Sequence, residues 1–147
     1  MPQYGRPSAD TNNPGSYTDQ AGGSTNIYAT IDEVTLDDAD YIRSPLAPAS
    51  AIYVTKFSNL EDPQSSTGHV LRTRYAKDAA GGAQIDIVVQ LRQGYVSEVS
   101  QGTLIATRTF TNVGNTFTTD AYTLSGAEAD AITDYTSLYL RVSSNQV

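Results

Sequence analysis

Cysteine and tryptophan are absent from this chain of 147 residues, and methionine and histidine each occur once. Without cysteine, the chain can form neither a disulfide framework nor a thiolate metal site. We therefore expect it either in a reducing cytosol or in an assembly held together by contacts rather than by cross-links. The single histidine, His69, follows a glycine turn at the start of a predicted strand, where a plain surface or half-buried role is the expected one.

Long apolar runs are missing as well. No stretch approaches 18 consecutive apolar residues, so we expect no membrane-spanning helix and no membrane partner. The N-terminus lacks the basic and then apolar order of a secretory signal peptide, so none is expected. The length predicts a single domain.

Positive charge is scarce, since 9 Lys and Arg residues face 16 Asp and Glu residues, for a net charge of −7. Residues 1–42 hold seven acids and one base, which places six of the seven excess negative charges there. An acidic surface repels phosphate backbones, so no nucleic-acid binding is expected. A basic protein surface is a compatible partner, although ordinary solubility also accounts for the charge.

The first 25 residues are rich in Pro, Gly, Asn, Ser and Thr, and their bulky side chains besides the first methionine are Tyr4 and Tyr17. Such a stretch cannot bury enough apolar surface to offset the entropy of ordering. We therefore predict an extended N-terminal arm over 1–25 and a folded domain over 26–147. Tyr4 and Tyr17, with Arg6 between them, are the predicted partner contacts of this arm, because tyrosine offers an apolar face and a polar tip.

From residue 26 onward, short segments of alternating polarity are separated by turn-forming clusters, which is typical of strands. The predicted strands are 27–31, 51–57, 69–76, 84–92, 103–111, 116–124 and 138–143. Ser125 and Glu128 have the spacing of a capping box and predict one or two helical turns before the last strand. Turns recur roughly every 8 to 12 residues, as in antiparallel sandwiches. We predict an all-β, jelly-roll-like antiparallel β-sandwich, and the helix before the last strand favours this over an immunoglobulin topology.

Acidic residues cluster between the first two predicted strands. Asp37, Asp38 and Asp40 are candidate calcium ligands, because calcium takes carboxylate and carbonyl oxygens. Their spacing does not match an EF-hand, and the alternative is an Asp-capped turn. No serine in a nucleophile-elbow sequence accompanies His69, so we predict neither an enzyme nor any catalytic residue.

Tyrosine is unusually frequent, with ten residues against three phenylalanines. Tyrosine enrichment is typical of interfaces. Tyr95 follows a glycine turn and is predicted to point outward from a loop, as a fourth candidate partner contact. The tyrosines predicted to lie in the core are Tyr28, Tyr41, Tyr53 and Tyr75.

Several segments together are similar to a known module. They are Arg6-Pro-Ser-Ala-Asp10, Ile27-Tyr-Ala-Thr-Ile-Asp-Glu33, Asp37-Asp-Ala-Asp-Tyr-Ile-Arg-Ser-Pro45, Gly68-His-Val-Leu-Arg-Thr-Arg-Tyr75 and Ala131-Ile-Thr-Asp-Tyr-Thr-Ser-Leu-Tyr-Leu-Arg-Val142. Over most of residues 5–143 the chain resembles a β-sandwich module of virion and prophage-encoded structural proteins of tailed bacteriophages. Members of that group usually carry a tryptophan in the arm, where this chain has Tyr17.

The resemblance implies a non-enzymatic capsid decoration (cement) protein, made in the bacterial cytoplasm and placed on the capsid surface of the virion. Its implied partners are the major capsid protein and copies of itself, as a trimer. The alternatives are a head-spike, tail-fibre or tail-adaptor module and, from another class, a carbohydrate-binding module. The lack of tryptophan argues against the carbohydrate-binding module, because sugar platforms rely on aromatic faces.

Overall fold

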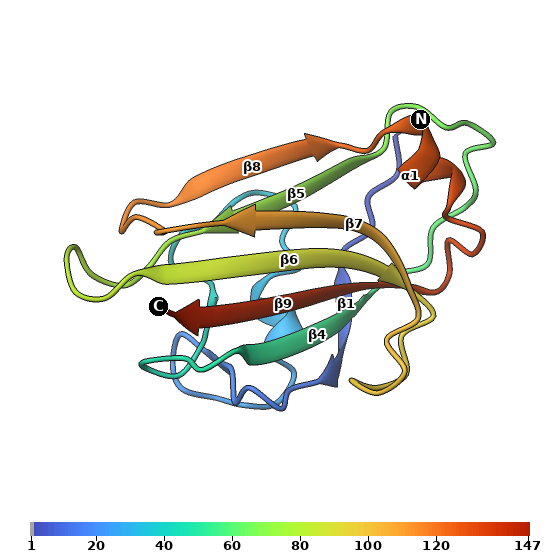
Figure 1. Ribbon diagram of the computed structural model, residues 1–147. Coiled ribbons are helices and arrows are strands. Elements are labelled where there is room, and N and C mark those ends of the chain that lie inside the picture. The colour runs from blue at the N-terminus through green and yellow to red at the C-terminus, as the bar shows by residue number, and fades with distance from the viewer. Residues whose placement is uncertain (1) are drawn as a thin grey trace.

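The computed structural model describes residues 2–147 and shows an all-β chain with one short α-helix (Figure 1). The strands are β1 (Pro7–Asn12), β2 (Thr18–Asp19), β3 (Ile42–Arg43), β4 (Ala51–Phe57), β5 (Val70–Tyr75), β6 (Ile85–Gln93), β7 (Thr103–Phe110), β8 (Thr118–Thr123) and β9 (Leu138–Gln146). The helices are the 3-10 helix η1 (Ile27–Thr30) and α1 (Gly126–Asp130). Helix α1 directly precedes the last strand and carries the predicted capping box between Ser125 and Glu128.

Five strands form the main sheet in the order β1-β4-β9-β6-β7, and every pairing is antiparallel. Strands β5 and β8 form a separate antiparallel ribbon, which runs along the β7 side of the main sheet in Figure 1. Strands β2 and β3 form a second, shorter ribbon. The prediction of an all-β antiparallel chain with one short helix before the last strand is therefore confirmed. A complete jelly roll has eight strands in two sheets, and jelly-roll topology stays a prediction.

The core forms where the alternating strands turn their apolar faces to the β5–β8 ribbon. Tyr53 on β4 lies beside Val142 on β9, and Val142 lies beside Val89 on β6, so one face of the sheet is continuous across three strands. The buried side chains of this core are Leu71, Val89, Leu91, Ile105, Ala106, Phe110, Val113, Leu124, Ile132, Tyr135, Leu138 and Leu140. Burial of such side chains stabilises a fold by about 1.5–3 kcal/mol each.

The N-terminal segment is part of this fold. Strand β1 pairs with β4 as an edge of the main sheet, and Tyr17 is only 4% exposed. The Tyr17 ring lies 5.9 Å from the ring of Tyr53, and its hydroxyl donates to Ser144 Oγ at 2.8 Å. This corrects the prediction of an extended arm over 1–25 that lies apart from a folded domain over 26–147, because backbone pairing and one buried tyrosine make the segment part of that domain.

The predicted strand over 27–31 is also wrong, since residues Ile27–Thr30 form the helix η1. The Asp10 carboxylate on β1 accepts the backbone N–H groups of Ile27 and Tyr28, both at 2.9 Å. Ile27 is 1% exposed and packs in a second core cluster with Tyr17. The contact that selects the helix therefore comes from a residue 17 positions earlier, which local periodicity does not report.

Candidate functional site

The acidic segment, which we define as residues 31–41, runs between η1 and β3 without regular secondary structure. Arg74 on β5 fixes its middle, because its guanidinium donates to both carboxylate oxygens of Asp38, with 2.6 Å between Nη2 and Oδ2. This contact lowers the pKa of Asp38. On the other side, Arg6 Nη1 donates to the carbonyl oxygen of Glu33. The segment is therefore attached to the sandwich at two points.

The three predicted calcium ligands lie in this segment, but their carboxylates have different partners. Asp37 Oδ1 accepts the backbone N–H of Ala39 at 2.8 Å, while the Asp38 carboxylate is held by Arg74. Within residues 2–147, no three His, Asp or Glu side chains gather in a geometry that holds a metal ion. The arrangement of Asp37 is that of the alternative interpretation, an Asp-capped turn.

The carboxyl groups of Glu33 and Asp40 are neighbours within the acidic segment. Glu33 Oε1 and Asp40 Oδ1 are both buried, and neither has a hydrogen-bond partner among the described residues. Burial raises the pKa of Glu33, and the neighbouring Asp40 and Asp32 carboxyl groups raise it further. The fold therefore favours the protonated form of Glu33 more than the unfolded chain does.

We expect Glu33→Gln to make the protein more stable than wild type at pH 8 and to give no advantage at pH 4. Because the pKa of Glu33 is raised on folding, its contribution is fully present below the unfolded-state pKa and is lost as the pH rises through the folded-state pKa. Partial exposure limits the expected gain to about 1 kcal/mol or less. Urea unfolding of both proteins at the two pH values measures it, with Asp78→Asn at an exposed turn as the control. A gain that is equal at both pH values would contradict a raised pKa of Glu33 as its cause.

Aliphatic side chains stand exposed on the same acidic segment. Val34 is 85% exposed and Leu36 is 69% exposed, and both lie between Glu33 and Asp37 along the chain. Leu46, on the loop between β3 and β4, is exposed as well. These side chains would lose their contact with water if a partner protein covered the segment. Val34, Leu36 and Leu46 are not among the predicted partner contacts, although two of them are aliphatic residues among acids in a stretch without strand alternation, which is a usable signal.

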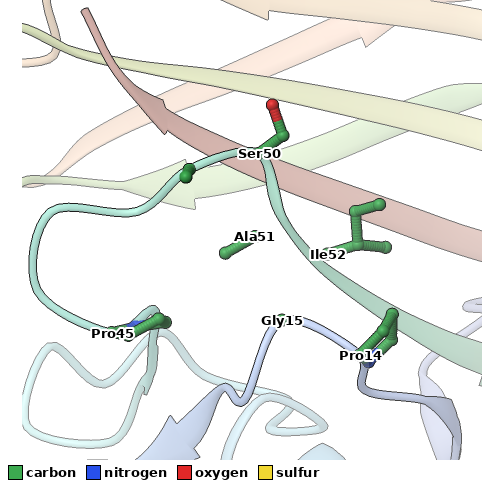
Figure 2. A pocket seen from close by; sticks show the side chains of 7 residues that line it. Pro14, Gly15, Pro45, Ser50, Ala51 and Ile52 are labelled. Atoms are coloured by element: carbon green, nitrogen blue, oxygen red, sulfur yellow. The ribbon is translucent and has the colours of Figure 1, made fainter.

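A shallow apolar hollow lies beside the start of β4 (Figure 2). Its volume is about 230 Å³, and its lining residues are Pro14, Gly15, Pro45, Ala49, Ser50, Ala51 and Ile52. Gly15 N donates to the Ile52 carbonyl at 2.9 Å, and a Cβ at residue 15 would lie 2.1 Å from Ile52 N, so only glycine fits there. The lining residues include no ionisable side chain, so this hollow suits an aliphatic group.

A second hollow is polar and lies between helix α1 and the turn before β5. Its lining residues are Asp62, Gln64, Ser65, Ser66, Ala129, Asp130, Ile132 and Tyr135. His69 Nε2 lies 2.7 Å from the Tyr135 hydroxyl, and burial raises the pKa of that hydroxyl, with a further contribution from the two aspartates. His69 is thus a half-buried residue whose ring is held by Tyr135, as its position in the sequence suggested.

The predicted partner contacts separate into two groups. Tyr4 is exposed, and the Arg6 guanidinium lies 5.4 Å from the centre of its ring. Tyr17 is buried in the core described above, so the chain itself provides its contacts. Tyr4 and Arg6 therefore remain predicted partner contacts, whereas Tyr17 does not.

Tyr95 is 3% exposed, which corrects the prediction that it points outward. Its ring lies 5.9 Å from that of Tyr139, and its hydroxyl accepts from Asn12 Nδ2 at 2.9 Å and donates to Glu98 Oε1 at 2.8 Å. Arg141 Nη2 holds the same carboxylate at 2.7 Å and lowers the pKa of Glu98. The loop after Gly94 folds back over the main sheet, and this network covers the tyrosine that the turn was expected to expose.

Comparison with known proteins adds no relative. No family model, curated protein or solved structure matches the chain. Among residues 2–147, no helix has the length and apolar character needed to cross a membrane.

Proposed function

We propose that this chain is a non-enzymatic structural protein of a bacteriophage virion, a decoration protein on the capsid surface that stabilises the head by bridging neighbouring capsid subunits. The major capsid protein and copies of this chain are its proposed partners, and a jelly-roll-like sandwich is the proposed scaffold. The virion context is inferred from the resemblance of the sequence to a module of tailed-bacteriophage structural proteins. The location of the proposed binding surface is inferred from the acidic segment.

The observation that carries the proposal is the display of Val34 and Leu36 among carboxylates on a segment tied to the sandwich. Burial of two such aliphatic side chains against a partner contributes about 1.5–3 kcal/mol each. The surrounding acids, with no base in residues 31–41, favour a partner surface that is basic at its rim and apolar at its centre. Repetition of such a contact over a capsid lattice gives high avidity from modest single contacts.

We expect purified protein to bind saturably to capsids that lack it and to raise the temperature at which those capsids open. The double substitution Val34→Ser and Leu36→Ser removes the apolar centre of the surface, so it should weaken binding by about tenfold or more. Co-sedimentation with the capsids measures occupancy, and release of the packaged genome on heating measures stabilisation.

The matched control is Val96→Ser with Val99→Ser, which makes the same chemical change on another exposed loop. Equal loss of binding by both double variants would contradict the choice of the acidic segment. Absence of wild-type binding to the lattice would overturn the decoration role itself.

The polar hollow beside Tyr135 is the one feature that favours the carbohydrate-binding alternative. Its aspartate and serine side chains offer the oxygens that bind sugar hydroxyls. The aromatic ring is 9% exposed, however, so it offers little face for stacking on a sugar. Binding to a glycan array that is abolished by Asp130→Asn, in a protein that does not bind capsids, would select this alternative.

A further inference from the structure

Strand β8 has a free edge. It pairs with β5 on one side, and no strand among the described residues pairs with its other side. No backbone hydrogen bond within residues 2–147 involves Thr119, Ala121 or Thr123 on that free side, and all three residues are exposed. In Figure 1, β8 forms the outer border of the molecule.

The register of the β5–β8 ribbon shows which backbone groups face outward. Leu124 N donates to the carbonyl of His69 at 2.9 Å, one position beyond the last residue of β8. Because hydrogen-bonded and non-hydrogen-bonded positions alternate in an antiparallel pair, residues 118, 120 and 122 also direct their N–H and C=O groups to β5. Thr119, Ala121 and Thr123 therefore direct theirs away from the molecule.

Features that usually prevent edge pairing are scarce on this strand. Strand β1, the free edge beside β4, contains Pro7 and two register shifts, and both disfavour the addition of another strand. Strand β8 contains no proline and no lysine, and its register with β5 has no shift. Its one charge, Asp120, is turned toward β7 and paired with Arg108 at 2.8 Å.

We propose that β8 pairs antiparallel with β8 of a second copy of this chain, about a two-fold axis at Ala121, to form a continuous four-stranded β5-β8-β8-β5 sheet. In this register Ala121 faces Ala121, and Thr119 faces Thr123. These pairs form about six inter-chain backbone hydrogen bonds, two for each hydrogen-bonded pair. The inference does not depend on the virion role, and it replaces the trimer implied by the resemblance with a dimer.

The side chains of β8 are compatible with this self-pairing. On the outer face, alanine at the axis allows close approach, and threonines opposite each other are a favourable cross-strand pair. On the inner face, Asp120 lies opposite Tyr122 of the second copy, so no charge meets a like charge. Arg72 on β5 lies opposite Ala121 on β8. In the β5-β8-β8-β5 sheet the two copies of Arg72 are three strand spacings, or about 14 Å, apart, and salt screens their repulsion at this distance.

Sedimentation equilibrium between about 10 µM and 1 mM tests the proposal, since the short edge implies weak association. The wild-type mass should rise from 15.7 kDa toward twice that value. Ala121→Lys and Ala121→Glu place like charges opposite each other, so each should raise the dimer Kd by about tenfold, and an equimolar mixture should restore dimers. A wild-type protein that remains monomeric, a trimer, or a mixture without recovery would each overturn the proposal.

Because the chain lacks cysteine, a single introduced thiol gives an independent measurement. Directly opposed residues in a hydrogen-bonded pair have Cα atoms about 5.5 Å apart, within the range of a disulfide. Ala121→Cys should therefore form covalent dimers at least ten times faster than Thr107→Cys, an exposed control on β7. Equal rates for the two variants would exclude this pairing, whereas Ala121→Ser should dimerise as the wild type does.

Discussion

Removal of residues 1–25 is expected to abolish the cooperative thermal unfolding of the domain. The deletion removes the whole β1–β4 ladder and leaves one hydrogen-bonding edge of β4 without a partner. It also removes Tyr17, which packs on Tyr53 and bonds to Ser144 of the last strand. Loss of a buried aromatic side chain alone costs about 3–5 kcal/mol, and a domain of this kind has about 5–15 kcal/mol in total. Circular dichroism during heating measures the outcome.

The matched control is removal of residues 1–5, which ends before β1. Gln3 exchanges two hydrogen bonds with the backbone of Glu61 at an exposed position, at 2.8 and 2.7 Å, so a loss of about 1 kcal/mol is expected. If residues 26–147 unfold at the same temperature as the full chain, the N-terminal segment is an appendage after all, and the contacts of Tyr17 contribute nothing to stability.

The strands after residue 50 could be predicted from the sequence because the alternation of apolar and polar residues within each strand indicates which side chains are buried. The segment 51–57 was predicted from alternation and coincides with β4 (Ala51–Phe57). The capping box between Ser125 and Glu128 is equally local, with Glu128 N bonded to Ser125 Oγ at 3.3 Å. In both cases the residues that determine the structure lie within a few positions of one another.

The errors share the opposite property. The burial of Tyr17 depends on Ser144, which is 127 positions away, and the burial of Tyr95 depends on Asn12, which is 83 positions away. A polar, glycine-rich sequence gives no signal that one of its tyrosines completes a core built elsewhere. The predicted arm and the predicted outward loop failed for this reason.

The same distinction applies to the candidate site. The acidic cluster was evident from the sequence, but its chemistry depends on distant cations: Arg74 engages Asp38 from 36 positions away, and Arg6 reaches the backbone of Glu33 from 27 positions away. These contacts attach the segment to the sheets and leave Val34 and Leu36 exposed between them. The acidic cluster could therefore be located from the sequence, whereas the partners of its carboxylates could not.

Asp10→Ala is expected to destabilise the protein by about 3 kcal/mol or more, although Asp10 is only partly buried. Its carboxylate accepts three hydrogen bonds, from Ile27 N, from Tyr28 N and from the hydroxyl of Tyr53 at 2.7 Å. Burial raises the pKa of Tyr53, and so does Asp10, so this hydroxyl stays protonated as a donor. Alanine would leave all three donors without their acceptor, and each orphaned buried donor costs about 1–3 kcal/mol.

Tyr53→Phe is the matched comparison, because it removes the hydroxyl and leaves the two backbone bonds of Asp10 intact. It should cost about 1 kcal/mol, since the aromatic ring remains in its place in the core. Urea unfolding of both variants and of the double variant forms a cycle that separates the Tyr53 contact from the cap of η1. If Asp10→Ala were no worse than Tyr53→Phe, the cap would contribute nothing, and Asp10 could not be what selects a helix over the predicted strand at residues 27–31.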